Sequence, residues 1–135
     1  MEVNQLTDDL CVRGQITPQD IKAIKDAGFK TIICNRPDGE KPDQAPVAEV
    51  RAAAEAAGLE FHENPIAPGA ITPEAVRKQG EAIRNAEGKV LAYCGSGQRA
   101  TALWMLANPH QLSAEERLQC ASKAGYDLGA LRPHL

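Results

Sequence analysis

The sequence has no long apolar run, because its apolar stretches are far shorter than the roughly 20 residues of a membrane-spanning helix. It also has no basic run, and its net charge of −3 argues against nucleic acid as the main partner. Residues 1–5 lack the basic-then-apolar pattern that opens a signal peptide. These absences predict a cytoplasmic protein that binds neither membranes nor nucleic acid.

The cysteines form no Cys-x-x-Cys pair and match no zinc-binding spacing. Four are present, at positions 11, 34, 94 and 120. We therefore expect no metal and no cofactor, and a reducing compartment disfavours a disulfide framework. Each cysteine has to be interpreted from its own neighbours.

The chain of 135 residues alternates between helix signals and short extended runs. A Thr-Pro pair, typical of a helix start, opens a helix at Thr17 and another at Thr72, and a third helix is predicted between them over 46–57. Glycines 28, 58 and 88 end these helices, and each is followed by a strand-like run, at 29–34, 59–62 and 89–93. A further strand pair is expected within 3–13.

Two more helices are predicted in the C-terminal part. Residues 100–107 are apolar nearly all round, which is typical of a buried helix, and a capping box at Ser113 opens another helix that continues to Ala124. The alternation predicts an α/β fold. We expect one domain over 1–135, with a central, largely parallel sheet flanked by helices.

One loop joins the apolar strand at 90–93 to the buried helix. It reads Cys94, Gly95, Ser96, Gly97, Gln98 and Arg99. Two glycines let successive backbone N–H groups turn inward to form an anion-binding nest, and the following helix N-terminus adds partial positive charge. Arg99 adds a planar fork for an oxyanion. All three effects favour a thiolate at Cys94, which is the nucleophilic form.

A cysteine in a core is often only a small apolar residue, and glycine-rich turns between strand and helix are common. The joint occurrence of strand, cysteine, two glycines, arginine and helix favours catalysis at Cys94. Gly95, Ser96, Gly97 and Gln98 are then expected to bind the anionic substrate.

A second polar segment follows the strand that ends at Cys34. Arg36 and Asp38 should lie on the same sheet edge as Cys94, because the carboxyl ends of parallel strands share one edge. Arg36 is a candidate for binding the anion, and Asp38 for orienting an arginine or donating a proton. The same residues also read as an ordinary Arg-Pro-Asp-Gly turn.

Residues 90–99, with Leu103 and Trp104 after them, resemble the active-site segment of the beta-lactamase-hydrolase-like, phosphatase-like domain family. The segment 34–40 resembles a second signature of that family. The resemblance implies a fold similar to the dual-specificity protein phosphatases. Some members occur fused to, or beside, persulfide-oxidising enzymes, and a rhodanese-type sulfurtransferase role has been assigned to them. An arginine is common in the family where this chain has Gly95.

Three features bear on the choice between phosphate hydrolysis and sulfur transfer. Phosphatases of this type resemble Cys-x5-Arg, whereas only four residues separate Cys94 from Arg99. They also need an upstream aspartic acid to protonate the leaving group, and the chain has no Asp between positions 43 and 127. The residue after the arginine is Ala100 where phosphatases usually have Ser or Thr, with Thr101 one place later.

These features favour a rhodanese-like sulfurtransferase. Cys94 would attack thiosulfate or a persulfide, become a persulfide itself, and pass the sulfur to cyanide or to a thiol such as glutathione, since sulfite and thiolates leave without a proton. A functional link to a persulfide-oxidising enzyme is expected. A cysteine-dependent phosphatase that forms a phosphocysteine is the first alternative. A non-catalytic thiol redox sensor is the second.

Overall fold

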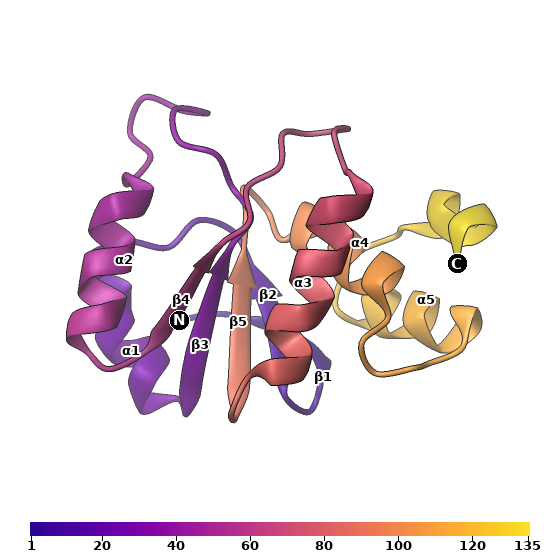
Figure 1. The fold of residues 1–135 in the computed structure, drawn as a ribbon, viewed down its shortest axis with the longest axis horizontal. Coiled ribbons are helices and arrows are strands. Elements are labelled where there is room, and N and C mark those ends of the chain that lie inside the picture. Colours follow the sequence, from indigo (N-terminus) through magenta and orange to yellow (C-terminus); the bar gives the residue numbers. More distant parts are fainter.

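A five-stranded sheet forms the centre of the protein, with strand order β1-β2-β5-β3-β4 (Figure 1). The structure is a computed structural model that describes all residues, 1–135. The strands are β1 (Asn4–Thr7), β2 (Leu10–Arg13), β3 (Phe29–Cys34), β4 (Glu60–Glu63) and β5 (Lys89–Tyr93). β1 pairs antiparallel with β2, and the other three pairings are parallel. The expected largely parallel sheet and its leading strand pair are confirmed.

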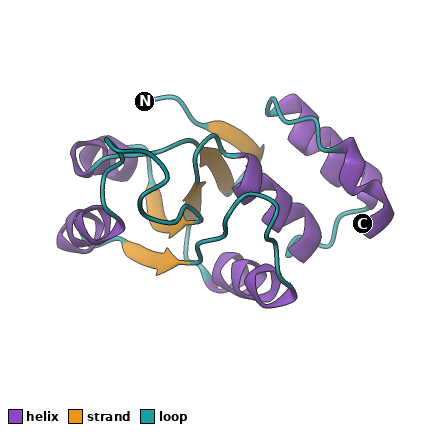
Figure 2. Cartoon of the chain, turned by 90° about the horizontal axis from the view of Figure 1, so that it is seen from above, coloured by secondary structure: helices purple, strands orange, loops and turns teal.

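Helices cover both faces of the sheet, as the view from above shows (Figure 2). They are α1 (Ile21–Asp26), α2 (Val47–Ala56), α3 (Pro73–Asn85), α4 (Gln98–Ala107) and α5 (Ala114–Lys123). The Thr72 hydroxyl accepts the Ala75 N–H and so caps α3, and the predicted capping box at Ser113 opens α5. None of these helices is both long and apolar enough to cross a bilayer.

Two short 3-10 segments complete the chain. The helix expected from Thr17 begins as the 3-10 turn η1 (Pro18–Asp20) before α1 follows. The second, η2 (Gly129–His134), lies at the C-terminal end, where the sequence pattern predicts no element.

The alternation of side chains along β5 assigns residues to two cores. Leu91 and Tyr93 pack with α1 and α2 on one face. Val90, Ala92 and then Cys94 pack with α3, α4 and α5 on the other face. The period of two therefore continues past the end of β5, and it directs the Cys94 side chain toward α4.

Backbone hydrogen bonds extend the ladder beyond the carboxyl ends of the parallel strands. Cys94 N–H donates to the Arg13 carbonyl at 3.2 Å, and Asn64 N–H donates to the Cys34 carbonyl at 2.8 Å. Asn35 N–H likewise donates to the Tyr93 carbonyl at 2.8 Å. The loops that follow β2, β3, β4 and β5 are thereby held side by side at one edge of the sheet.

Candidate active site

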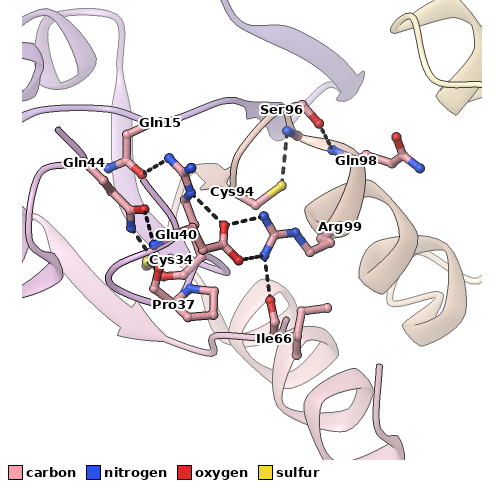
Figure 3. A network of polar contacts seen from close by, with 12 residues as sticks. Gln15, Cys34, Pro37, Glu40, Gln44, Ile66, Cys94, Ser96, Gln98 and Arg99 are labelled. Carbon is pink, nitrogen blue, oxygen red and sulfur yellow. Dashed lines mark hydrogen bonds and ion pairs between the residues drawn. The ribbon is translucent and has the colours of Figure 1, made fainter. Parts of the chain in front are cut away.

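Cys94 lies at the start of the loop after β5, where the residue is only 1% exposed. The Gly97 N–H donates a hydrogen bond to the Cys94 sulfur at 3.1 Å (Figure 3). A backbone donor at this distance stabilises a thiolate more than a thiol. The loop therefore curls around the sulfur as the sequence predicts.

Four further N–H groups around Cys94 have no hydrogen-bond partner within the protein, namely those of Gly95, Ser96, Arg99 and Ala100. They surround the N-terminus of α4, whose ten residues add a helix dipole. Unpartnered backbone donors at a helix N-terminus form an anion-binding site. Four intervening residues are therefore enough to build an oxyanion nest beside the sulfur.

Arg99 is fixed by three hydrogen bonds from two of its nitrogens. Nη1 donates to Glu40 at 2.9 Å and to the Ile66 carbonyl at 2.7 Å, and Nη2 donates to Glu40 at 2.8 Å (Figure 3). A guanidinium has five N–H donors, so two remain, the Nε–H and one Nη2–H. These two lie on the same edge of the planar group, which leaves one complete edge for a bidentate oxyanion.

Glu40 joins the two arginines of the site. Its carboxylate accepts both bonds from Arg99 and a third from Arg36 Nε at 2.8 Å, while Arg36 Nη1 donates to the Gln15 side chain at 3.1 Å. The hydrogen bonds from Arg99 and then Arg36 hold the pKa of Glu40 below its usual value. The bond to Glu40 in turn raises the pKa of Arg99, and the nearby Cys94 adds to that rise.

The loop that carries Glu40 is closed by a side chain from its own far end. Gln44 accepts the Glu40 N–H at 3.2 Å and donates to the Pro37 carbonyl at 2.8 Å. Sequence reasoning singled out Arg36 and Asp38 in this segment but missed Glu40. The two form an ion pair four residues apart, but in a loop that spacing does not predict a contact as it would on a helix, so the sequence gives no local signal for Glu40.

A buried polar triad supports the opposite side of the site. Asn35 and Gln79 exchange two hydrogen bonds of 2.9 Å, and Asn64 donates to Gln79 at 2.9 Å. The backbone of Asn35 also accepts the Ile66 N–H at 3.1 Å. The triad therefore fixes the start of the 64–72 loop, and with it the Ile66 carbonyl that holds Arg99.

Tyr126 clamps the nest from outside, and sequence reasoning missed it too. Its hydroxyl donates to the Ser96 carbonyl and accepts from the Asn4 side chain, both at 2.8 Å. It packs so closely on Gly97, whose φ is +96°, that a Cβ there would lie 2.1 Å from the hydroxyl oxygen. Only glycine fits this position. Because Tyr126 comes from the segment after α5, no local pattern around Cys94 points to it.

The remaining predicted residues divide into two groups. Arg36 is buried and, with Arg99, borders Gly95, where an added Cβ would lie 3.2 Å from Arg99 Nη2. Asp38 is exposed and accepts the Val47 N–H at 2.8 Å, so it caps α2 instead of joining the arginines. Gln98 is also exposed.

Two further questions from the sequence concern a second thiol near Cys94 and the hydroxyl of Thr101. All four cysteines are free, and Cys34 packs on the sheet face opposite to Cys94, so β3 offers no resolving thiol. The Thr101 hydroxyl donates to the Gly97 carbonyl at 2.8 Å, and so it braces the loop.

The fold and the cysteine–arginine loop define a cysteine-phosphatase-like protein. The family model for the beta-lactamase hydrolase-like protein, phosphatase-like domain, matches residues 2–111. The chain belongs to this family, and the family and fold that the sequence suggested are confirmed.

Relatives and solved structures agree with that assignment. The chain is 35% identical over 106 residues to a beta-lactamase hydrolase-like protein of Agrobacterium fabrum, covering 78% of this chain but only 25% of the relative. The corresponding protein of Xylella fastidiosa is 31% identical over 131 residues, covering 96% of this chain and 30% of the relative. The chain thus spans about a quarter to a third of these relatives.

The structure is also similar to solved structures. A crystal structure of a candidate phosphatase from Neisseria meningitidis has a TM-score of 0.85 and 34% identity, covering 98% of this chain and 95% of that one. The catalytic core of the PP-IP phosphatase Siw14 from S. cerevisiae, at 13% identity and a TM-score of 0.69, covers 96% of this chain and 80% of that one. At that identity the second likeness shows the fold alone.

The sulfurtransferase prediction is wrong, because the family model and the Neisseria structure both point to a phosphatase-like protein. The geometry shows why the reasoning failed. The number of residues between Cys94 and Arg99 does not give the number of free donors: the short loop and the first turn of α4 together still present four amides and one guanidinium edge. The sulfur donor and the thiol acceptor were expected as substrates of that sulfurtransferase reaction.

Proposed function

We propose that this protein is a cysteine-dependent phosphatase that acts through a phosphocysteine on Cys94. The observation that carries the proposal is the set of unpartnered donors around one sulfur. Four free backbone N–H groups and the free edge of Arg99 surround a cysteine whose own sulfur already accepts the Gly97 N–H. A phosphoryl dianion needs such donors for its three non-bridging oxygens.

In the first step the Cys94 thiolate attacks phosphorus. The S–P bond forms, the P–O bond to the leaving group breaks, and its electron pair leaves with that oxygen. The free edge of Arg99 would bind two equatorial oxygens while the amides of Gly95 and Ser96 bind the third. Donors placed in advance around a developing charge provide most of the rate enhancement in sites of this type.

In the second step water attacks the phosphocysteine. The P–S bond breaks, the thiolate returns to Cys94, and inorganic phosphate is released. The donors that stabilise the thiolate make it a good leaving group here. The cytoplasmic location that the sequence predicts fits this chemistry, because a reducing compartment keeps the thiol available.

The test compares Cys94→Ser with Cys120→Ser, a matched control on α5. We expect the first variant to lose turnover of an aryl phosphate while it keeps its circular dichroism spectrum and melting temperature, and the second to retain turnover. Acid quench of the wild type during turnover should trap phosphate on Cys94, detected by intact-mass analysis and peptide mapping. Retained turnover in Cys94→Ser would refute the proposal.

A further inference from the structure

The edge of the sheet that carries Cys94 has few groups able to give up a proton. Three of the four loops there, 14–17, 64–72 and 94–97, contain no Asp, Glu, His or Lys. Every carboxyl group of the four loops therefore lies in the fourth, 35–46. The phenol nearest to the nest, Tyr126, already donates its proton to the Ser96 carbonyl.

The carboxyl groups of the 35–46 loop are Asp38, Glu40 and Asp43. Glu40 accepts three bonds from two arginines, so it stays ionised and has no proton to give. Asp38 accepts the first N–H of α2, where the negative charge stabilises the helix N-terminus. Asp43 is exposed and forms no hydrogen bond or ion pair. Glu63, the last residue of β4, is paired with Arg51. Thus no carboxyl group of the four loops or of the strand ends beside them is held in place as a proton donor to a leaving group.

The loop after β4 is already engaged in holding Arg99. Its Ile66 carbonyl accepts from Arg99, and its first residue, Asn64, is held in the buried triad. A proton donor in this loop would need an acidic side chain, and the sequence from Asn64 to Thr72 has none. The loop positions the arginine and supplies no acid to the site.

We propose that this site acts on phosphoryl groups whose leaving oxygen departs without a proton, namely phosphoanhydrides, acyl phosphates and phosphates of acidic phenols, in preference to alkyl phosphate esters. The inference rests on the proposed phosphatase function. The P–O bond breaks to release a carboxylate, a phosphate or a phenolate, and each of these is stable as an anion. An alkoxide is far more basic and would need the missing acid.

The experiment measures kcat/KM for a series of aryl phosphates whose phenols become progressively more basic, with an alkyl phosphate and acetyl phosphate as the two ends. A positioned general acid contributes about 10²–10⁴-fold, most of it on basic leaving groups. We therefore expect kcat/KM to fall by at least roughly 10²-fold from the most acidic to the most basic phenol. We also expect acetyl phosphate to be turned over and the alkyl phosphate not to be.

Two variants make the result specific. Asp43→Asn should leave the whole series unchanged. Asp38→Asn keeps a side-chain oxygen that can cap α2. It too should keep the fall in kcat/KM from acidic to basic phenols. A flat series in the wild type, or a selective loss of the basic phenols in either variant, would overturn the inference by revealing a working acid. A complete lack of turnover on every substrate, with no phosphate trapped on Cys94, would instead overturn the phosphatase function and this inference with it.

Discussion

The variant Glu40→Gln tests whether Glu40 positions Arg99 without itself binding the substrate. The carboxylate accepts one bond from Arg36 and two from Arg99, whereas an amide offers one oxygen and turns an NH₂ group toward a guanidinium. A hydrogen bond to a charged group is worth about 1.5–3 kcal/mol, and breaking a fully buried ion pair costs about 3–5 kcal/mol. Because Glu40 is about one-fifth exposed, we expect the free energy of unfolding at pH 7 to fall by about 2–4 kcal/mol.

The kinetic effect of Glu40→Gln should fall mainly on kcat. Loss of one well-placed oxyanion donor costs about 10²–10³-fold in kcat, and an unheld Arg99 loses the alignment of its free edge. KM should change little or fall, because removing a negative charge beside two arginines favours an anionic substrate. The assay is steady-state turnover of an acidic aryl phosphate. Glu115→Gln, which breaks an exposed pair with Arg132, serves as the matched control and should leave both constants unchanged.

The pH dependence of stability gives an independent check. The pKa of Glu40 is lower in the folded protein than its usual value of 4.5. The pairing therefore stabilises the fold above that pH, and this contribution disappears as the pH falls through the folded-state pKa. Urea denaturation should show that the wild type has a larger free energy of unfolding than Glu40→Gln. This difference should be full at pH 7 and become smaller in acid. Wild-type kcat together with a difference independent of pH would refute the reasoning.

Three further changes test other parts of the site. Arg99→Lys should lower kcat/KM by about 10²-fold or more in the aryl phosphate assay, because one ammonium cannot present an edge to substrate while holding the carboxylate; wild-type kinetics would contradict this. Tyr126→Phe should slow the alkylation of Cys94 at a fixed pH, because the loop loses the bond that helps to hold the Gly97 N–H toward the sulfur, whereas Tyr93→Phe, which removes a buried hydroxyl with no hydrogen-bond partner, should not; equal alkylation rates would show that the clamp has no effect on the thiol. Gln79→Leu should lower the free energy of unfolding by about 2–3 kcal/mol in urea titrations, because two buried amides lose partners, and an unchanged midpoint would argue against the triad.

The loop around Cys94 could be predicted because its geometry is local. An apolar strand, two glycines and a buried helix follow one another directly, so the direction of the sulfur and of the nest follows from the residues in order. The strand–helix alternation likewise predicts a parallel sheet whose carboxyl edge gathers the loops.

The partners of that loop could not be predicted in the same way. Glu40 and Arg99 are 59 residues apart and meet because β3 lies beside β5, an order that no local pattern reveals. Asp38 has the same chemistry as Glu40 and lies two residues before it, but its carboxylate turns to α2. The choice between sulfur and phosphate failed for a related reason, since it depended on which donors stay free after folding.

The hydrogen bonds of Tyr126 connect segments near both ends of the chain to the loop that carries Cys94. Tyr126 bonds to Asn4, 122 residues away, and to the Ser96 carbonyl, 30 residues away. The Asn4 contact spans more of the chain than the strand pairings of the sheet, such as Leu10 with Val90, so it has the larger loop-closure cost. During refolding, the sheet and helices should therefore be regained before the thiol recovers its full reactivity. The rate at which Cys94 regains its reactivity toward an alkylating reagent would then report how fast the segment that carries Tyr126 docks.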